Sequence, residues 1–112
     1  MLKTDLKTKR LYEITTRSPF DDSIVKRDAQ GYRVVILGLE EFSFFVHRRI
    51  EPVGSDSWRI SEVTTGFALP SDLDGSTRQE AIDNATTFLS EKGKPKFITA
   101  MDRAKNLLRG DE

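Results

Sequence analysis

Two aspartates and a glutamate lie close together in the segment PSDLDGSTRQEA, which begins at Pro70. A calcium loop of the EF-hand type places oxygen ligands at positions one, three and five, glycine at six and glutamate at twelve. With Gly75 at position six, Asp72 and Asp74 fall at positions three and five. Positions one and twelve would then be Pro70 and Ala81, which supply no side-chain oxygen. The register fails at both ends, and we expect no calcium site.

The same segment predicts a turn followed by a capped helix. Thr77 and Glu80 have the spacing of a capping box, in which the Thr77 hydroxyl accepts the Glu80 N–H and the Glu80 carboxylate reaches back to the Thr77 amide. Such a cap satisfies N–H groups that have no partner within the helix. We therefore give Thr77 and Glu80 a structural role.

His47 is the single histidine of the chain. A hydrolase triad would need a nucleophile and an orienting acid beside it, and no motif such as G-x-S-x-G supports that arrangement. One histidine without any cysteine is also a poor ligand set for a transition metal. We expect a protein that is not an enzyme and has no metal or cofactor, with His47 half exposed on a strand.

Aromatic and basic residues alternate in FSFFVHRRI, residues 42–50. Exposed rings can stack on bases and arginines can hold phosphates, so this pattern is the strongest nucleic-acid signal in the chain. Strand alternation sends Phe42 and Phe44 to one face and Phe45 to the other. We expect most of these rings to pack beneath helices. The candidate contacts for a partner protein or nucleic acid are Phe45, His47, Arg48, Arg49 and Arg59.

Composition narrows the classes of function. The 18 basic and 18 acidic residues cancel, which argues against a non-specific nucleic-acid binder. Without cysteine there is no disulfide, no thiolate catalysis and no cysteine-bound zinc. No apolar run is long enough for a signal peptide or a membrane span. We expect a soluble, cytoplasmic protein with no membrane partner.

Hydrophobic periodicity predicts strands first and helices second. Alternation favours strands at residues 11–16, 24–28, 32–39, 42–50, 58–63 and 67–70, with a hairpin turn at residues 29–31. A 3.6-residue period favours a helix over 77–92, a break at Gly93 and a second helix from Pro95.

This order indicates an α+β fold. We predict an antiparallel β-meander of four to five strands, followed by two C-terminal helices packed on one sheet face. Residues 1–20 are interpreted as a basic N-terminal arm or a short helix or strand, and residues 21–112 as a single α+β domain.

Residues 66–95, GFALPSDLDGSTRQEAIDNATTFLSEKGKP, resemble HicB-type antitoxins, in which a strand, a turn and a helix opening T-x-x-E-A follow one another. That resemblance implies direct contact with a small ribonuclease toxin. DGSTRQEAIDNATTFL is also similar to the last turn and helix of the double-stranded RNA-binding domain, whose order is helix, three strands, helix. The lysines that begin the helix in that family are replaced here by Thr77, Arg78, Gln79 and Glu80, so its phosphate grip is not expected.

SEVTTGFALP and TRQEAI are similar to segments of short bacterial or phage accessory proteins. Together these observations favour a non-enzymatic binding or regulatory module that contacts another protein or a second copy of itself. The alternatives are an RNA-binding module that uses the sheet face with Arg48 and Arg49, and a HicB-like antitoxin.

Overall fold

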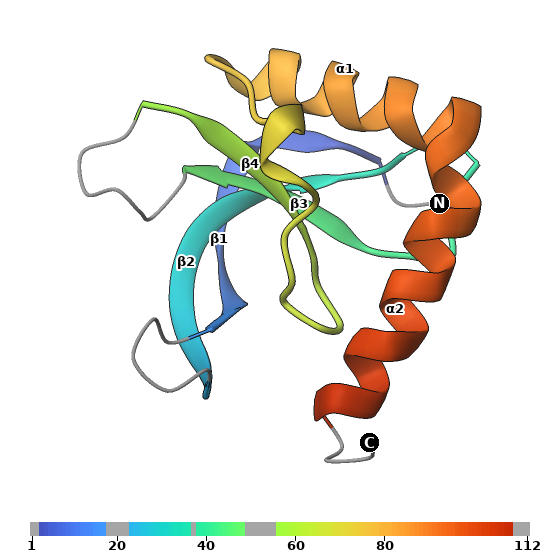
Figure 1. The fold of residues 1–112 in the computed structure, drawn as a ribbon. Coiled ribbons are helices and arrows are strands. Elements are labelled where there is room, and N and C mark those ends of the chain that lie inside the picture. Colours follow the sequence, from blue (N-terminus) through green and yellow to red (C-terminus); the bar gives the residue numbers. More distant parts are fainter. Residues whose placement is uncertain (1–2, 18–22, 37, 49–55, 109–112) are drawn as a thin grey trace.

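The structure is a computed structural model, which describes residues 3–17, 23–36, 38–48 and 56–108. Its strands form one antiparallel sheet in chain order: β1 (Asp5–Arg17), β2 (Ile24–Val34), β3 (Phe44–Arg48) and β4 (Trp58–Glu62). Figure 1 shows the sheet with the helices to one side of it. The predicted α+β meander, with strands preceding helices, is confirmed.

Helix α1 (Arg78–Phe88) follows a short 3-10 turn, Ser71–Leu73, and packs on β4 and β3. A π-helical turn, Leu89–Gly93, joins it to α2 (Lys94–Leu108), so the chain bends sharply without the predicted break (Figure 1). A side chain at Gly93 would overlap the Phe88 ring, so the missing Cβ lets that ring pack against the turn. Within the described residues, no helix is both long and apolar enough to cross a membrane.

The prediction of a turn at residues 29–31 is wrong, because these residues continue β2 without interruption. Ala29 pairs with Tyr12 of β1, and Gly31 pairs with His47 of β3. A Cβ at Gly31 would collide with the backbone of Val46. The glycine therefore marks a close approach between two strands rather than a turn.

The first strand is longer than predicted. Residues 5–10, part of the segment interpreted as a basic arm or a short helix or strand, belong to β1, with a register shift before Arg10. The described part of the N-terminal segment is thus an edge strand of the sheet.

The sheet curls until its first strand meets the turn after β4. The segment 67–69 runs beside β4, where Leu69 N–H donates to the Ile60 carbonyl at 2.9 Å. Just before this segment, the Gly66 carbonyl accepts the N–H of Thr15 in β1 at 2.8 Å. The Thr15 hydroxyl also donates to the Thr65 carbonyl at 2.6 Å. These bonds bridge the two ends of the sheet.

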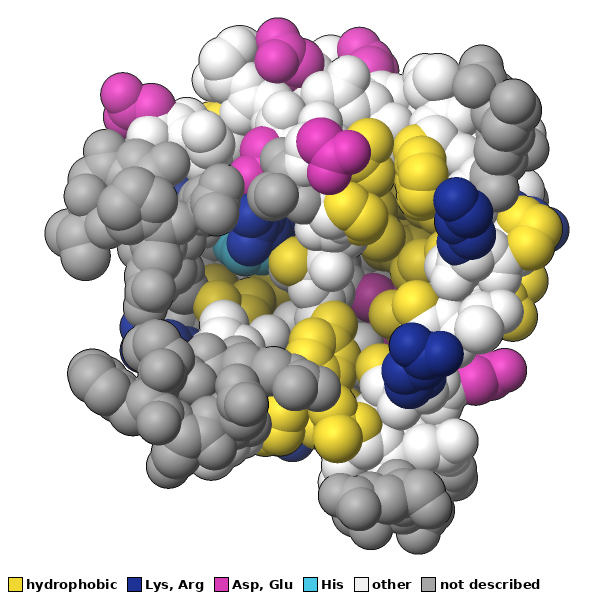
Figure 2. All heavy atoms as spheres, in the orientation of Figure 1, with side chains coloured by type: hydrophobic (Ala, Val, Ile, Leu, Met, Phe, Trp, Pro, Cys, Tyr) yellow, Lys and Arg dark blue, Asp and Glu magenta, His cyan; other side chains and the backbone are white. Residues whose placement is uncertain are grey.

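The curled sheet has an apolar cluster on each face. Beneath the helices, the Phe97 ring lies 4.9 Å from Phe42 and 5.5 Å from Phe44 between ring centroids. Hydrophobic side chains gather between the helices and the sheet in Figure 2. Inside the curl, the buried Phe45 ring stacks on Tyr12 at 4.3 Å, beside Ile14 and Ala29.

Candidate functional site

Aromatic and basic side chains meet at one end of the helix-covered sheet face. In the strand register, Tyr32 of β2 lies opposite Val46 of β3, and Arg48 of β3 lies opposite Trp58 of β4. Because side chains alternate along a strand, Tyr32, Arg48 and Trp58 point to the same side of the sheet. Helix α1 adds Arg78, its first residue, over the two rings.

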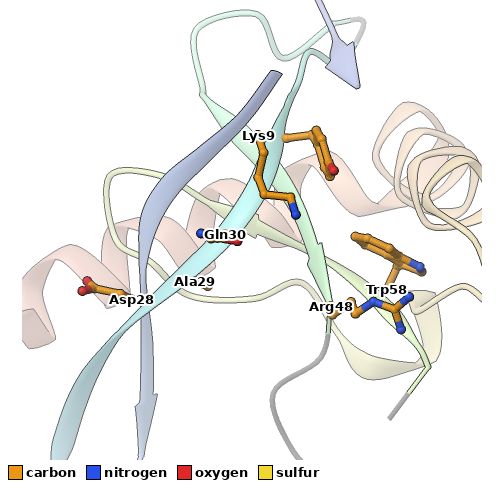
Figure 3. A pocket seen from close by; sticks show the side chains of 7 residues that line it. Lys9, Asp28, Ala29, Gln30, Arg48 and Trp58 are labelled. Carbon is orange, nitrogen blue, oxygen red and sulfur yellow. The ribbon is translucent and has the colours of Figure 1, made fainter. Parts of the chain in front are cut away.

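Tyr32, Arg48 and Trp58 line a hollow of about 330 Å³, which we call the aromatic hollow (Figure 3). It is lined by Lys9, Asp28, Ala29, Gln30, Tyr32, Arg48 and Trp58. Ligand pockets in proteins measure roughly 300–1,000 Å³. The aromatic hollow is therefore large enough to receive a few side chains of a partner.

Two arginines hold the rings of the aromatic hollow in place. The Arg78 guanidinium lies 4.6 Å from the Tyr32 ring centroid and 5.9 Å from that of Trp58, while Arg48 lies 5.0 Å from Trp58. Arg78 Nη1 also donates to the carbonyl of Leu6 at 2.9 Å, which fixes the guanidinium between α1 and β1. Cation–π contacts of this kind contribute roughly 0.5–2 kcal/mol.

The charge partner of Arg48 holds it only weakly. Arg48 Nη1 lies 3.4 Å from Asp56 Oδ1, and the two side chains are 59% and 98% exposed. Exposed ion pairs of this type contribute about 0–1 kcal/mol. Arg48 can therefore exchange Asp56 for another carboxylate at little cost.

Of the predicted contact residues that the structure describes, Arg48 alone lines the aromatic hollow. Arg59 makes a bidentate pair with Asp74, whose carboxylate oxygens lie 3.1 and 3.2 Å from its guanidinium nitrogens. This pair ties β4 to the loop before α1. Arg49 lies outside the described residues.

Phe45 and His47 are buried inside the curl, at 0% and 2% exposure, so the expectation of a half-exposed His47 is wrong. The Nδ1 of His47 lies 2.8 Å from the Arg48 carbonyl. A carbonyl can only accept, so Nδ1 carries the proton and Nε2 accepts from the Ser61 hydroxyl at 2.7 Å.

Burial is the main cause that lowers the pKa of His47 from its ordinary value. The hydrogen bond to the Arg48 carbonyl raises the pKa, while the nearby charge of Arg59 lowers it and that of Asp74 raises it. The imidazole is therefore neutral at pH 7, which suits its role as an acceptor for Ser61.

A serine that donates to histidine resembles part of a hydrolase triad. Here the Ser61 side chain is completely buried, and a backbone carbonyl occupies the place of the orienting acid. A substrate carbonyl has no access to Ser61 in this arrangement. The hydrogen bond between His47 and Ser61 instead satisfies the polar groups of two buried side chains in the core.

The predicted helix cap is confirmed on one side and differs on the other. Thr77 Oγ1 accepts the N–H of Glu80 at 3.0 Å, as predicted. The Glu80 carboxylate reaches one residue further back and accepts the N–H and hydroxyl of Ser76, both at 3.2 Å. Asp74 of the rejected calcium loop pairs with Arg59. The described residues contain no cluster of three or more histidine or acidic residues suited to a metal ion.

Sequence patterns contain little indication that the other residues around the aromatic hollow would meet. Tyr32 and Trp58 stand at the ends of predicted strands, and Arg78 lies in the first turn of a predicted helix. Their meeting depends on how α1 crosses the sheet, which no local pattern encodes. The signal in the sequence was that Trp58, the one tryptophan, opens its strand.

The chain matches no protein-family model, and no curated protein or solved structure is significantly similar to it. The fold also differs from the order implied by the similarity to the double-stranded RNA-binding domain. Where that family has its first helix, residues 5–17 form β1.

Proposed function

We propose that the chain is a non-enzymatic module of the cytoplasm that binds another protein through the aromatic hollow. The observation that carries this proposal is the convergence of Tyr32, Trp58, Arg48 and Arg78 on one half-open surface. Tryptophan, tyrosine and arginine are the residues most enriched where protein interfaces concentrate their binding energy.

An exposed leucine beside the aromatic hollow supports the proposal that a protein partner binds there. Leu11 is 67% exposed and lies opposite Gln30, which lines the aromatic hollow. An apolar side chain at the rim adds area that a partner can bury, at about 25 cal/mol for each Å². Rings, cations and an apolar rim together form a surface suited to a protein partner.

Nucleic acid is the second candidate, because arginines beside exposed rings also suit stacked bases and phosphates. The balance of charges favours a protein partner over nucleic acid. The 18 basic residues are matched by 18 acidic ones, Asp28 lines the aromatic hollow, and Asp56 pairs with Arg48. A polyanion would meet repulsion there.

The test uses two matched double variants. Leu11→Ser with Arg48→Ala removes an exposed apolar side chain and a cation at the aromatic hollow. Ile98→Ser with Lys105→Ala does the same on α2, where Ile98 is 38% exposed. Arg48→Ala removes a cation–π contact of roughly 0.5–2 kcal/mol with Trp58, and the other three changes fall on exposed side chains and should each cost roughly 0.5 kcal/mol or less, so both variants should fold.

Each protein is immobilised and exposed to a lysate of the source cells, and any retained protein is purified and titrated against all three chains. We expect a partner whose dissociation constant rises at least tenfold with the hollow variant and stays unchanged with the α2 variant. A partner that binds the two variants equally well would contradict the proposal.

A further inference from the structure

Charge is unevenly distributed along the aromatic hollow. Figure 3 shows Asp28 at one end and Arg48 with Trp58 at the other, with Lys9 between them. The end that holds the rings is therefore the positive end. A ligand that enters the hollow therefore meets cations beside an aromatic surface at one end and the carboxylate of Asp28 at the other.

Two cations that line the aromatic hollow, Lys9 and Arg48, are available to a ligand. Lys9 is exposed and forms no ion pair with any residue that the structure describes. The Arg48 guanidinium lies over the Trp58 ring, and among the described residues its one ion pair is with the almost fully exposed Asp56. A guanidinium forms two parallel hydrogen bonds with a carboxylate, and such charge-assisted bonds are about twice as strong as neutral ones.

The acids around the site limit how much negative charge a ligand can bring. Because Lys9 and Arg48 both line the aromatic hollow, a single carboxylate can bind there while the rest of the ligand avoids Asp28. A chain of phosphates would place further negative charge near Asp28 and Asp56. The distribution of charge thus suits one isolated carboxylate beside an apolar group.

We propose that the ligand of the aromatic hollow is an acidic protein segment, in which an aspartate or glutamate stands next to a large hydrophobic side chain. The carboxylate binds Arg48 and Lys9, and the hydrophobic side chain packs on Trp58 and Leu11. This inference rests on the proposed function and adds the chemistry of the partner.

The experiment selects short random peptides displayed on phage against the immobilised wild-type chain. Phage that also bind the Leu11→Ser, Arg48→Ala variant are removed first. We expect the selected peptides to share an acidic residue adjacent to an aromatic or aliphatic one. A selected peptide and its analogue with asparagine or glutamine in place of the acid are then synthesised and titrated by fluorescence polarisation.

The acid-to-amide change should weaken binding to the wild type by about tenfold, the effect of losing one charge-assisted hydrogen bond. With Arg48→Gln the tenfold difference between the two peptides should become clearly smaller, because only Lys9 then remains to pair with the carboxylate. Lys105→Gln, a charge loss on α2, should leave the tenfold difference intact. Unfolding curves of the variants confirm that each is folded, and Lys9→Gln provides a second exposed test of the same contact.

The possible results separate the two proposals. Peptides that need Leu11 and Arg48 but carry no acidic residue would overturn the acidic ligand and leave protein binding standing. If the selection yields no peptide whose binding depends on the aromatic hollow, both proposals are overturned. Binding of a fluorescent oligodeoxythymidylate that is tighter than that of any peptide, and lost with Arg48→Gln, would overturn both in favour of single-stranded nucleic acid.

Discussion

The buried pair of His47 and Ser61 lies between β3 and β4. In the neutral imidazole, Nδ1 donates to the Arg48 carbonyl and Nε2 accepts from the Ser61 hydroxyl. A protonated Nε2 would donate to the same hydroxyl, which can also accept, so these hydrogen bonds suit either charge state. Burial penalises the charged form and therefore favours the neutral histidine in the folded state.

His47 should therefore make folding depend on pH. Its pKa in the folded chain is lowered from 6.5, so the unfolded state binds more protons in the pH range just below 6.5. The stability that the neutral imidazole contributes is complete above pH 6.5 and is lost as the pH falls through the folded-state pKa. The slope is at most about 1.4 kcal/mol per pH unit for one proton.

Urea unfolding of the wild type and of His47→Gln between pH 8 and pH 5 measures this contribution. The variant should be less stable at pH 8, and the difference between the two proteins should shrink as the pH falls. Parallel curves across the whole range would show that His47 does not titrate in this way.

Helix α1 links the fold to the aromatic hollow through its first turn. Thr77 caps the helix, and the next residue, Arg78, extends its guanidinium over Tyr32 and Trp58 and bonds the Leu6 carbonyl of β1. The start of the helix thus determines where that cation lies. The same contact covers part of the exposed edge of β1, which also carries Lys7 and Lys9, and charged residues on an edge strand discourage pairing with other chains.

Thr77→Ala should lower the free energy of unfolding by about 1 kcal/mol, because the Glu80 N–H loses its acceptor. Thr77→Ser keeps the hydroxyl and should remain within a few tenths of a kcal/mol of the wild type. Chemical denaturation of the three proteins measures both values. Equal stability of the alanine and serine variants would show that the cap contributes nothing.

At the scale of the whole molecule, local patterns predicted the elements better than their contacts. Alternation in 42–50 correctly separated Phe44, under the helices, from Phe45, inside the curl. The 3.6-residue hydrophobic period was also sufficient to predict both helices. The turn assigned to Gly31 failed because a glycine serves equally for a bend and for close packing of strands. The meeting of Arg78 with Tyr32 and Trp58 depends on packing between distant segments, which the sequence pattern does not record.

The bridge between β1 and the turn after β4 is the contact that closes the curl, and Gly66 makes it possible. Gly66 has φ +74°, and a Cβ there would lie 2.6 Å from Thr15 Oγ1 and 2.9 Å from the Glu13 carbonyl oxygen. Gly38 has a similar φ of +89° with no atom within 4 Å of its added Cβ. Replacing either glycine by alanine therefore carries the energetic penalty of a positive φ, and only the change at Gly66 adds a steric clash.

Gly38→Ala should cost about 1–2 kcal/mol, the penalty of a left-handed backbone for a residue with a Cβ. Gly66→Ala should cost clearly more, since the added methyl group also forces β1 away from the turn and breaks the Thr15–Gly66 bond. Urea unfolding gives the difference, and amide hydrogen exchange locates it, with faster exchange at the Thr15 N–H in the Gly66 variant alone. Equal losses of stability and unchanged exchange at Thr15 would mean that the curl does not depend on this contact, and the buried environment of Phe45 and His47 would then need another explanation.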